Sequence, residues 1–250
     1  MAALPFILWL AEAAQAPVSA LETHGLHVRT ALDLADAPLT WLADHQPALI
    51  VLDAAALPGW VAEIRSNPAT RRIPIVAIAE TDAQNAAARY VGINHTLSAA
   101  EVVNVALLLL LASTTTAPTP AAIADACAET LPALAIQGFE EFNDHDFFEC
   151  HESLEAAWKA DSGPARDLYR VVLQVGLAYY QIERSNFSGA QKMFLRTQQW
   201  FLKLPDHCRG VDLGQLRSDA AAARAHLEQL GPDRITQFDM TLIRPLQWTT

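Results

Sequence analysis

The first 112 residues alternate short apolar runs with stretches of helical pattern, and this alternation restricts the fold more than any other feature. Strands buried on both faces read as continuous apolar runs, of which ALIVL at 48–52 is an example. Alternating β and α segments predict a parallel sheet covered by helices on both faces. Five such units predict a flavodoxin-like doubly wound (βα)5 domain over residues 1–112. The predicted strands are 5–11, 25–31, 47–53, 73–79 and 91–97. The predicted helices are 16–24, 36–46, 57–67, 82–90 and 101–112.

A different pattern begins after residues 113–120, STTTAPTP, which we interpret as a linker because Thr, Ser and Pro dominate it. No strand-like run follows, and long helical stretches with short connections predict an antiparallel helical bundle over residues 121–250. The last apolar stretch, 235–248, is too hydrophobic for a free tail, so we expect it to dock on a domain. The predicted helices of this half are 121–142, 146–161, 165–184, 187–203 and 212–230.

Charge and cysteine content exclude several classes of protein. The chain carries 28 acidic and 17 basic residues, a formal net charge of −11, so we expect no binding to nucleic acid or to anionic membranes. Three widely spaced cysteines without a CxxC pair predict neither a disulfide nor a structural zinc site, and a reducing cytoplasm fits them. The apolar run 102–112 is far shorter than the ~20 residues of a membrane-spanning helix. We therefore expect a cytoplasmic protein.

The segment PALIVLDAAALPGWVAEIRSNPATRRIPIVAIAE, residues 47–80, resembles the receiver domains of two-component response regulators. The resemblance rests on a strand ending in Asp53, the sequence Leu57-Pro58-Gly59-Trp60, the pair Ile64-Arg65 and a strand entered through Pro74. It implies a phosphoryl-accepting site at the carboxyl ends of the strands. In that family an acidic pair binds Mg²⁺, an aspartate accepts the phosphoryl group, and a Thr or Ser and a Lys contact its oxygens.

This sequence keeps Asp53 but departs from the family pattern around it. The acidic pair is reduced to Ala11 and Glu12, and Ala79 followed by Glu80 occupies the Thr or Ser position. No lysine follows the fifth predicted strand. In one interpretation Asp53 is still phosphorylated with Mg²⁺. In the other, which we favour, its carboxylate caps a neighbouring loop in a pseudo-receiver, because nearby carboxylates would repel a phosphoryl group.

The predicted helix 101–112 is apolar on nearly every side. One face has to cover the sheet, and we expect the other to contact a partner. A second copy of the chain, which would give a homodimer, and the helical domain are both candidates for that contact.

The stretch FEEFNDHDFFECHESLEAAW, residues 139–158, resembles the signature of the DUF 309 family, and the resemblance extends from about residue 125 to residue 205. It implies a helical bundle and no particular reaction. The residues that carry it in the first stretch are Phe142, Asn143, Phe147, Phe148, Glu149, His151, Glu152, Glu155 and Trp158. Those of the later stretch are Gln174, Tyr180, Gly189 and Ala190.

Helical spacing places His151 and Trp158 on one face with Phe147 and Leu154, and Glu155 lies beside that face. We therefore expect His151 and Glu155 to point into the bundle. Just before them, Asn143 and Asp146 suit a turn and a helix N-cap, and Glu149 suits the first helical turn.

Three interpretations of this motif stay open. His151 and Glu155 could bind a metal with Glu152 as a base, in a metal-dependent hydrolase. The same side chains could line a pocket for an unknown small molecule or a peptide. They could also form a buried hydrogen-bonded network with Gln174 as partner, which we favour because facing buried polar groups usually satisfy each other.

Together these features predict a non-enzymatic regulatory or protein-interaction protein of signal-transduction type. We expect no cofactor, and Mg²⁺ only if the site at Asp53 is active. The alternatives are the metal-dependent hydrolase and a response regulator controlled through phosphorylation of Asp53.

Overall fold

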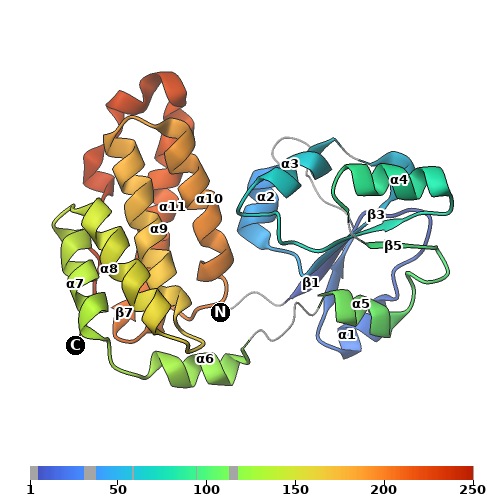
Figure 1. Ribbon diagram of the computed structural model, residues 1–250, viewed down its shortest axis with the longest axis horizontal. Helices are drawn as coiled ribbons and strands as arrows, with labels where there is room; N and C mark the ends of the chain where they lie inside the picture. Colours follow the sequence, from blue (N-terminus) through green and yellow to red (C-terminus); the bar gives the residue numbers. More distant parts are fainter. Residues whose placement is uncertain (1–4, 31–37, 58, 94, 113–117, 250) are drawn as a thin grey trace. The chain divides into compact units, whose positions relative to one another are not determined.

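The computed structural model describes residues 5–30, 38–57, 59–93, 95–112 and 118–249 (Figure 1). The chain divides into two compact units, Ala3–Ala117 and Pro118–Thr250. Residues 113–117 of the predicted linker, and the start of the predicted helix 36–46, lie outside the described residues.

The first unit contains a five-stranded parallel sheet in the order β2-β1-β3-β4-β5, which confirms the predicted flavodoxin-like arrangement. Its strands are β1 (Phe6–Trp9), β2 (His27–Arg29), β3 (Leu49–Asp53), β4 (Ile75–Ile78) and β5 (His95–Leu97). Its helices are α1 (Val18–Thr23), α2 (Pro38–His45), α3 (Trp60–Ser66), α4 (Asp82–Tyr90) and α5 (Val105–Ala112), with a 3-10 turn, η1 (Ala54–Ala56).

Alternate residues of the central strands enter two separate cores, one on each face of the sheet. Phe6 and Leu8 pack with α2, α3 and α4, whereas Ile7 and Trp9 pack with α1 and α5. Figure 1 shows these two sets of helices on opposite sides of the sheet. Burial on both faces explains why the strands read as unbroken apolar runs in the sequence.

The predicted helix 101–112 is four residues too long, because α5 begins only at Val105. Glu101 instead closes a turn: its carboxylate accepts hydrogen bonds from the N–H and the hydroxyl of Ser98, at 2.8 and 2.9 Å. Those bonds lower the pKa of Glu101. A side chain that bonds the backbone locally favours a turn over a helix interior.

The second unit is helical, and its central helix is α9, most of whose residues are buried between α8 and α10. The helices are α6 (Pro120–Cys127), α7 (Ala133–Asn143), α8 (Phe147–Ala160), α9 (Asp167–Glu183), α10 (Phe187–Phe201) and α11 (Leu213–Leu230). A short hairpin, β6 (His207–Cys208) and β7 (Val211–Asp212), precedes α11, and two 3-10 turns, η2 (Pro232–Gln237) and η3 (Met240–Leu242), follow it. None of the helices in the described ranges has the length and hydropathy needed to span a membrane.

The predicted single helix 121–142 is wrong, because the structure divides it into α6 and α7. Pro132 occupies the N-cap position of α7 with extended backbone, φ −72° and ψ 154°. A proline in the middle of a helix would lack the N–H that the helix needs and would clash with the preceding turn. The chain therefore changes direction here, and a new helix starts directly after the proline.

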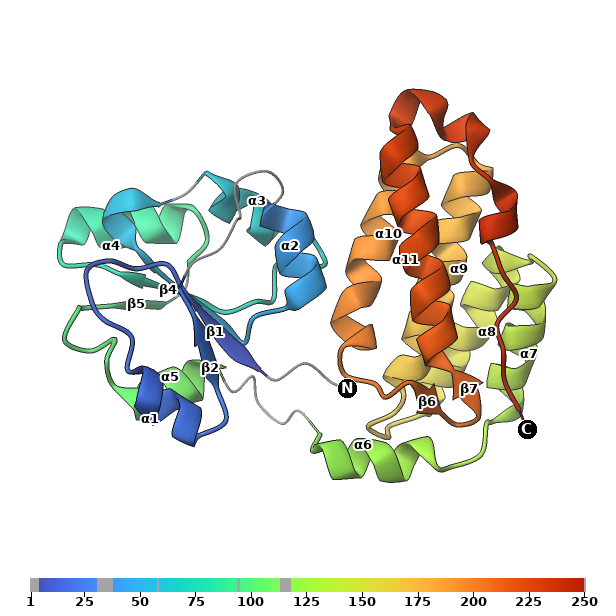
Figure 2. The same ribbon diagram turned by 180° about the vertical axis from the view of Figure 1, so that it is seen from behind.

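The C-terminal stretch docks on the helical unit along α7 and the β6–β7 hairpin (Figure 2). The Asn143 side chain holds the backbone of Leu246 with two hydrogen bonds, of 3.1 and 2.7 Å. Trp248 pairs with Val211 as an isolated antiparallel bridge and packs its ring edge-on against Phe139. These contacts explain the apolar character of the last residues.

Candidate functional site

At the carboxyl edge of the sheet, the Asp53 side chain is engaged by the backbone of the loop that follows β1. Its Oδ2 accepts a hydrogen bond from the N–H of Glu12 at 2.8 Å, and the N–H of Ala13 lies 3.4 Å from both carboxylate oxygens. The parallel register aligns the ends of β1 and β3, which brings this loop to Asp53. Asp53 thus has the geometry of a loop-capping carboxylate.

A second carboxylate, that of Glu80, connects the loops that follow β4 and β5. Glu80, directly after β4, accepts a hydrogen bond from the N–H of Ala99 at 2.6 Å. Ala99 lies in the loop after β5, where receiver domains have their lysine. In this protein the Glu80 carboxylate binds that loop instead. Ala79 precedes Glu80 and has no hydroxyl to offer a phosphate oxygen.

In the parts of the first unit that the structure describes, no Lys or Arg side chain forms an ion pair with Asp53. All three lysines of the chain, at positions 159, 192 and 203, belong to the second unit. The edge therefore carries three acidic residues, Glu12, Asp53 and Glu80, and within the described part of the unit no ion pair brings a cation to Asp53 that could stabilise a phosphoryl group.

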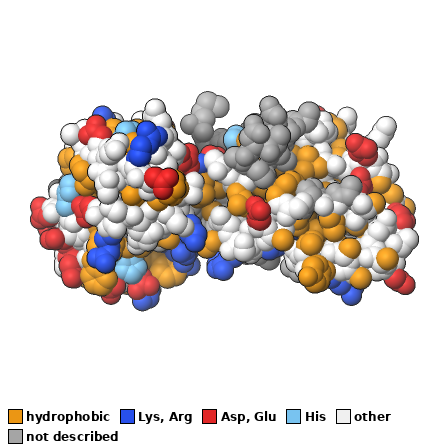
Figure 3. All heavy atoms as spheres, turned by 90° about the horizontal axis from the view of Figure 1, so that it is seen from above, with side chains coloured by type: hydrophobic (Ala, Val, Ile, Leu, Met, Phe, Trp, Pro, Cys, Tyr) orange, Lys and Arg blue, Asp and Glu red, His pale blue; other side chains and the backbone are white. Residues whose placement is uncertain are grey.

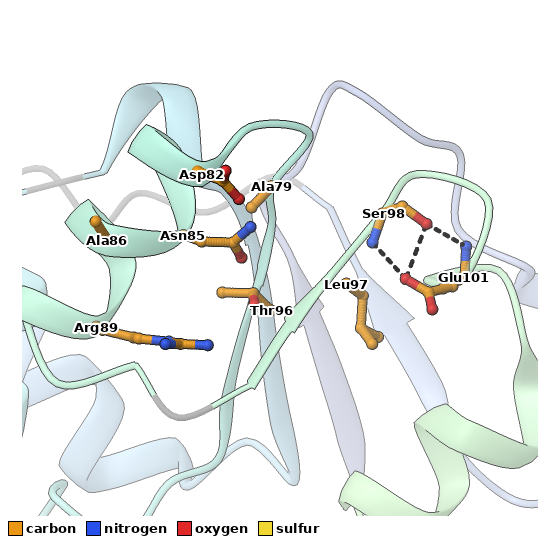
Figure 4. A pocket seen from close by; sticks show the side chains of 9 residues that line it. All are labelled: Ala79, Asp82, Asn85, Ala86, Arg89, Thr96, Leu97, Ser98 and Glu101. Carbon is orange, nitrogen blue, oxygen red and sulfur yellow. Dashed lines mark hydrogen bonds between the residues drawn. The ribbon is translucent and has the colours of Figure 1, made fainter.

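A pocket of about 500 Å³ opens between α4 and β5 in the same unit (Figure 4). Arg89 and Asn85 project from α4 toward Thr96 of β5, and the bonded pair Ser98 and Glu101 stands at the other side. The walls offer both charges and several hydrogen-bonding groups. The lining residues are Ala79, Asp82, Asn85, Ala86, Arg89, Thr96, Leu97, Ser98 and Glu101.

In the second unit, the inward face of α8 overlaps only in part with the one that we predicted. Its buried residues are Phe147, Cys150, Leu154 and Ala157. His151 and Glu155 instead lie at the boundary, with side chains 28% and 39% exposed. The prediction that both point into the bundle is therefore wrong. The reason is geometric: α8 is covered along the stripe through Cys150 and Ala157, and His151 and Glu155 lie at the margin of that stripe.

The two residues also have separate partners. The Nδ1 of His151 lies 3.0 Å from Glu152, and Glu155 accepts a hydrogen bond from Lys159 at 2.7 Å, which lowers the pKa of Glu155. Glu149 is exposed in the first turn of α8, and Asp146 stands at the N-cap position without a side-chain capping bond, contrary to its predicted role. No group of three His, Cys, Asp or Glu side chains suited to a metal occurs among the described residues.

Gln174 is buried in α9, as its apolar surroundings in the sequence indicate, but it is not satisfied as we predicted. Among the described residues, no donor forms a hydrogen bond with its Oε1. The Nε1 of Trp158 likewise finds no acceptor among them. Trp158 stacks under the guanidinium of Arg170, whose Cζ lies 3.8 Å from the ring centroid. Two buried polar atoms without hydrogen bonds lower the stability of the fold. The side chains of this motif therefore do not form the fully hydrogen-bonded network that we predicted.

A densely bonded polar cluster that we did not predict surrounds Arg209. This side chain is 4% exposed and donates hydrogen bonds to Asp161 at 2.6 Å, to Glu129 at 2.5 Å and to the hydroxyl of Tyr169. Its Nε also donates to the carbonyl of Ala126 at 3.0 Å. The partners come from distant parts of the chain, and no spacing in the sequence could have indicated them.

The hairpin places Arg209 in this position through its turn. Arg209 and Gly210 join β6 to β7 with φ values of 50° and 77°, the two left-handed residues of a type I′ turn. Such a backbone is strained for arginine and persists only where surrounding contacts hold it. The bonds of the guanidinium supply that support.

The expectation of no disulfide is wrong: Cys127 and Cys208 are bonded to each other, 81 residues apart in sequence. An odd number of cysteines without a CxxC pair does not exclude a bridge between distant segments. Cys150 is the third cysteine, free and buried.

Comparison with known proteins identifies part of the second unit. Residues 135–193 match the family described as a domain of unknown function, DUF309, which confirms the predicted resemblance over this segment. The uncharacterized protein YpuF of Bacillus subtilis (strain 168) is 43% identical over 49 residues. That segment is 19% of this chain and 28% of YpuF, so the match spans under a third of that protein. For the first unit, the structure establishes a parallel five-stranded α/β fold, and its receiver identity stays a prediction.

Proposed function

We propose that this protein is a non-enzymatic regulatory protein in which a receiver-like unit works without phosphorylation and serves as a surface for protein contacts. The observation that carries the proposal is the hydrogen bond between Asp53 and the N–H of Glu12. A phosphoryl group on the Oδ2 of Asp53 would break that bond, and on either oxygen it would lie at a sheet edge whose loops also carry Glu12 and Glu80. Like charges without a cation between them disfavour that product.

The contact surface that we propose is α5, whose sequence VALLLLLA holds only apolar residues. Leu108 and Ala112 are buried toward the sheet, whereas Leu110 is 69% exposed. Val103, in the turn before α5, is 44% exposed. Neighbouring apolar side chains at a surface mark protein contacts, and a second copy of this chain would cover them in a homodimer.

The phosphorylation part is tested with a small-molecule phosphodonor and Mg²⁺. We expect the intact mass of the full-length protein to stay unchanged, because the site lacks the groups that stabilise phosphoaspartate. A phosphorylatable response regulator in the same tube controls for the donor. A phosphoryl adduct that forms on the natural sequence and is absent from Asp53→Asn would overturn the proposal.

The contact part is tested by light scattering over a range of protein concentrations. We expect self-association of the natural chain, and Leu110→Glu should weaken it by about tenfold or more, since a buried apolar contact of ~1.4 kcal/mol or more is lost. Phe148→Glu is the matched control, because Phe148 is 54% exposed but lies in the other unit. A natural chain that is monomeric throughout, or dissociation caused by Phe148→Glu alone, contradicts this part.

The DUF309 segment, residues 135–193, forms part of the second unit of the proposed regulator. Its aromatic core residues pack against one another: Phe147 lies edge to face with Phe142 and with Tyr179, and Phe142 and Tyr179 are tilted against each other. Figure 3 shows Lys and Arg side chains dispersed among acidic ones on the face it presents, without a continuous basic surface. This distribution supports a role in contacts with proteins rather than with nucleic acid.

A further inference from the structure

The disulfide between Cys127 and Cys208 attaches α6 to the β6–β7 hairpin (Figure 2). Of the eight residues of α6 only Ala126 is buried, while Ile123 and Cys127 are partly buried against the core. A helix of two turns is marginal in water unless tertiary packing supports it. The covalent bond is therefore a major part of what holds α6 on the bundle.

The noncovalent attachments of α6 reach the same end of the helix as the disulfide does. The backbone N–H of Arg209 donates to the carbonyl of Cys127 at 2.6 Å, and its Nε donates to the carbonyl of Ala126 at 3.0 Å. The ion pair with Glu129 lies just beyond the helix, and the Glu129 side chain is 62% exposed. Water reaches the Glu129 side of this pair and reduces its contribution, although the Arg209 side chain is buried.

We propose that Cys127 and Cys208 form a thiol–disulfide switch that determines how firmly residues 118–131 are held on the helical unit. In the oxidised chain these residues are docked, and α7 follows directly after them at Pro132. In the reduced chain they exchange between docked and released states. When they are released, they extend the tether between the two units, and the proposal holds whether or not Asp53 accepts a phosphoryl group.

The gain in tether length is large. The fourteen residues 118–131 lie between the start of the second unit and the N-cap of α7. Fully extended, they span up to about 50 Å, and as a flexible coil they have a root-mean-square end-to-end distance of ~20 Å. Local concentrations within a linked pair of units depend steeply on such lengths.

The chemistry needs a dithiol reductant. Cys127 is partly exposed whereas Cys208 is 1% exposed, so the reductant's thiolate attacks the Sγ of Cys127. The S–S bond breaks, and Cys208 leaves as a thiolate that takes up a proton. The second thiol of the reductant then attacks the mixed disulfide, which frees Cys127 and leaves the reductant as a cyclic disulfide. Two electrons and two protons pass to the protein.

Cys150 is not a competing thiol in this exchange. It is buried in α8, and burial, with a smaller contribution from Glu141, raises the pKa of its thiol. A protonated, inaccessible thiol is a poor nucleophile. Cys150→Ser therefore provides a control that leaves the switch intact.

The test is hydrogen–deuterium exchange of the full-length protein, measured by mass spectrometry with and without dithiothreitol. We expect exchange within residues 118–131 to accelerate by about tenfold or more on reduction, because local opening becomes easier. Peptides from α9 should keep their protection. Reoxidation should restore the slow exchange, and Cys150→Ser should respond as the natural chain does.

The double variant Cys127→Ser/Cys208→Ser should exchange rapidly in this segment with or without reductant. Three results contradict the proposal. The first is equal exchange of residues 118–131 in the oxidised and reduced proteins. The second is loss of protection in α9 together with α6, which would make the bond a stabiliser of the whole bundle. The third is the absence of a Cys127–Cys208 linkage in protein treated with oxidised glutathione.

Discussion

Arg209→Met is expected to lower the free energy of unfolding of the helical unit by about 3–5 kcal/mol, the usual effect of removing one partner from a buried ion pair. Methionine fills a similar volume but donates no hydrogen bond. The Asp161 carboxylate, 16% exposed, would then keep its charge without its guanidinium partner, and Tyr169 would also lose a donor. Urea denaturation followed by far-ultraviolet circular dichroism measures the loss.

Arg184→Met is the matched control, because the Arg184 side chain is exposed and contacts the ring and hydroxyl of Tyr180. We expect this change to cost about 1 kcal/mol or less. Similar losses for the two variants would mean that the cluster around Arg209 contributes no more than a surface contact does.

The contribution of this cluster should also depend on pH. Burial disfavours the charged form of Asp161, but the N–H of Gly163 and the Arg209 guanidinium outweigh it, so the pKa of Asp161 lies below its ordinary value. A carboxyl whose pKa is lower in the folded state stabilises the fold above its unfolded pKa of about 3.9. That stabilisation is lost as the pH falls through the folded pKa. The difference between the natural chain and Asp161→Asn should therefore shrink below about pH 4.

Gly138→Val is expected to destabilise the helical unit by about 3 kcal/mol, because α7 and α8 approach too closely at this position for a side chain. A Cβ on Gly138 would lie 2.5 Å from the Cγ of Leu154, which is fully buried. Because Cγ is a branch point in a packed core rather than the free end of a side chain, the helices would have to separate. Thermal and urea denaturation both measure the effect.

Gln137→Val controls for the β-branched side chain, since Gln137 lies next to Gly138 on α7 but is exposed. It should cost about 1 kcal/mol or less. Leu154→Ala alone should cost about 2–5 kcal/mol by opening a cavity. Combined with Gly138→Val, the total loss should be smaller than the sum, because the valine fills part of that cavity. Strict additivity would show that the two residues do not meet.

The sequence by itself determined the parallel sheet and most of the helices. Continuous apolar runs locate β1, β3 and β4, because a strand covered on both faces has no solvent-facing residues to interrupt the run. The motif at residues 139–158 was identified as DUF309 for a related reason: its order of aromatic and polar residues lies within a few helical turns. Information of this kind is local, and the sequence displays it directly.

Only the tertiary structure decided which distant groups meet. The bond between Cys127 and Cys208, the partners of Arg209 and the docking of Leu246 on Asn143 join segments that are 40 or more residues apart. The inward face of α8 also depended on how the helices pack, which placed His151 at its margin, whereas the break at Pro132 follows from the proline itself. Periodicity assigns a residue to a face of a helix, but the neighbouring helices determine how much of that face is covered, and this balance of contacts is a property of the folded chain.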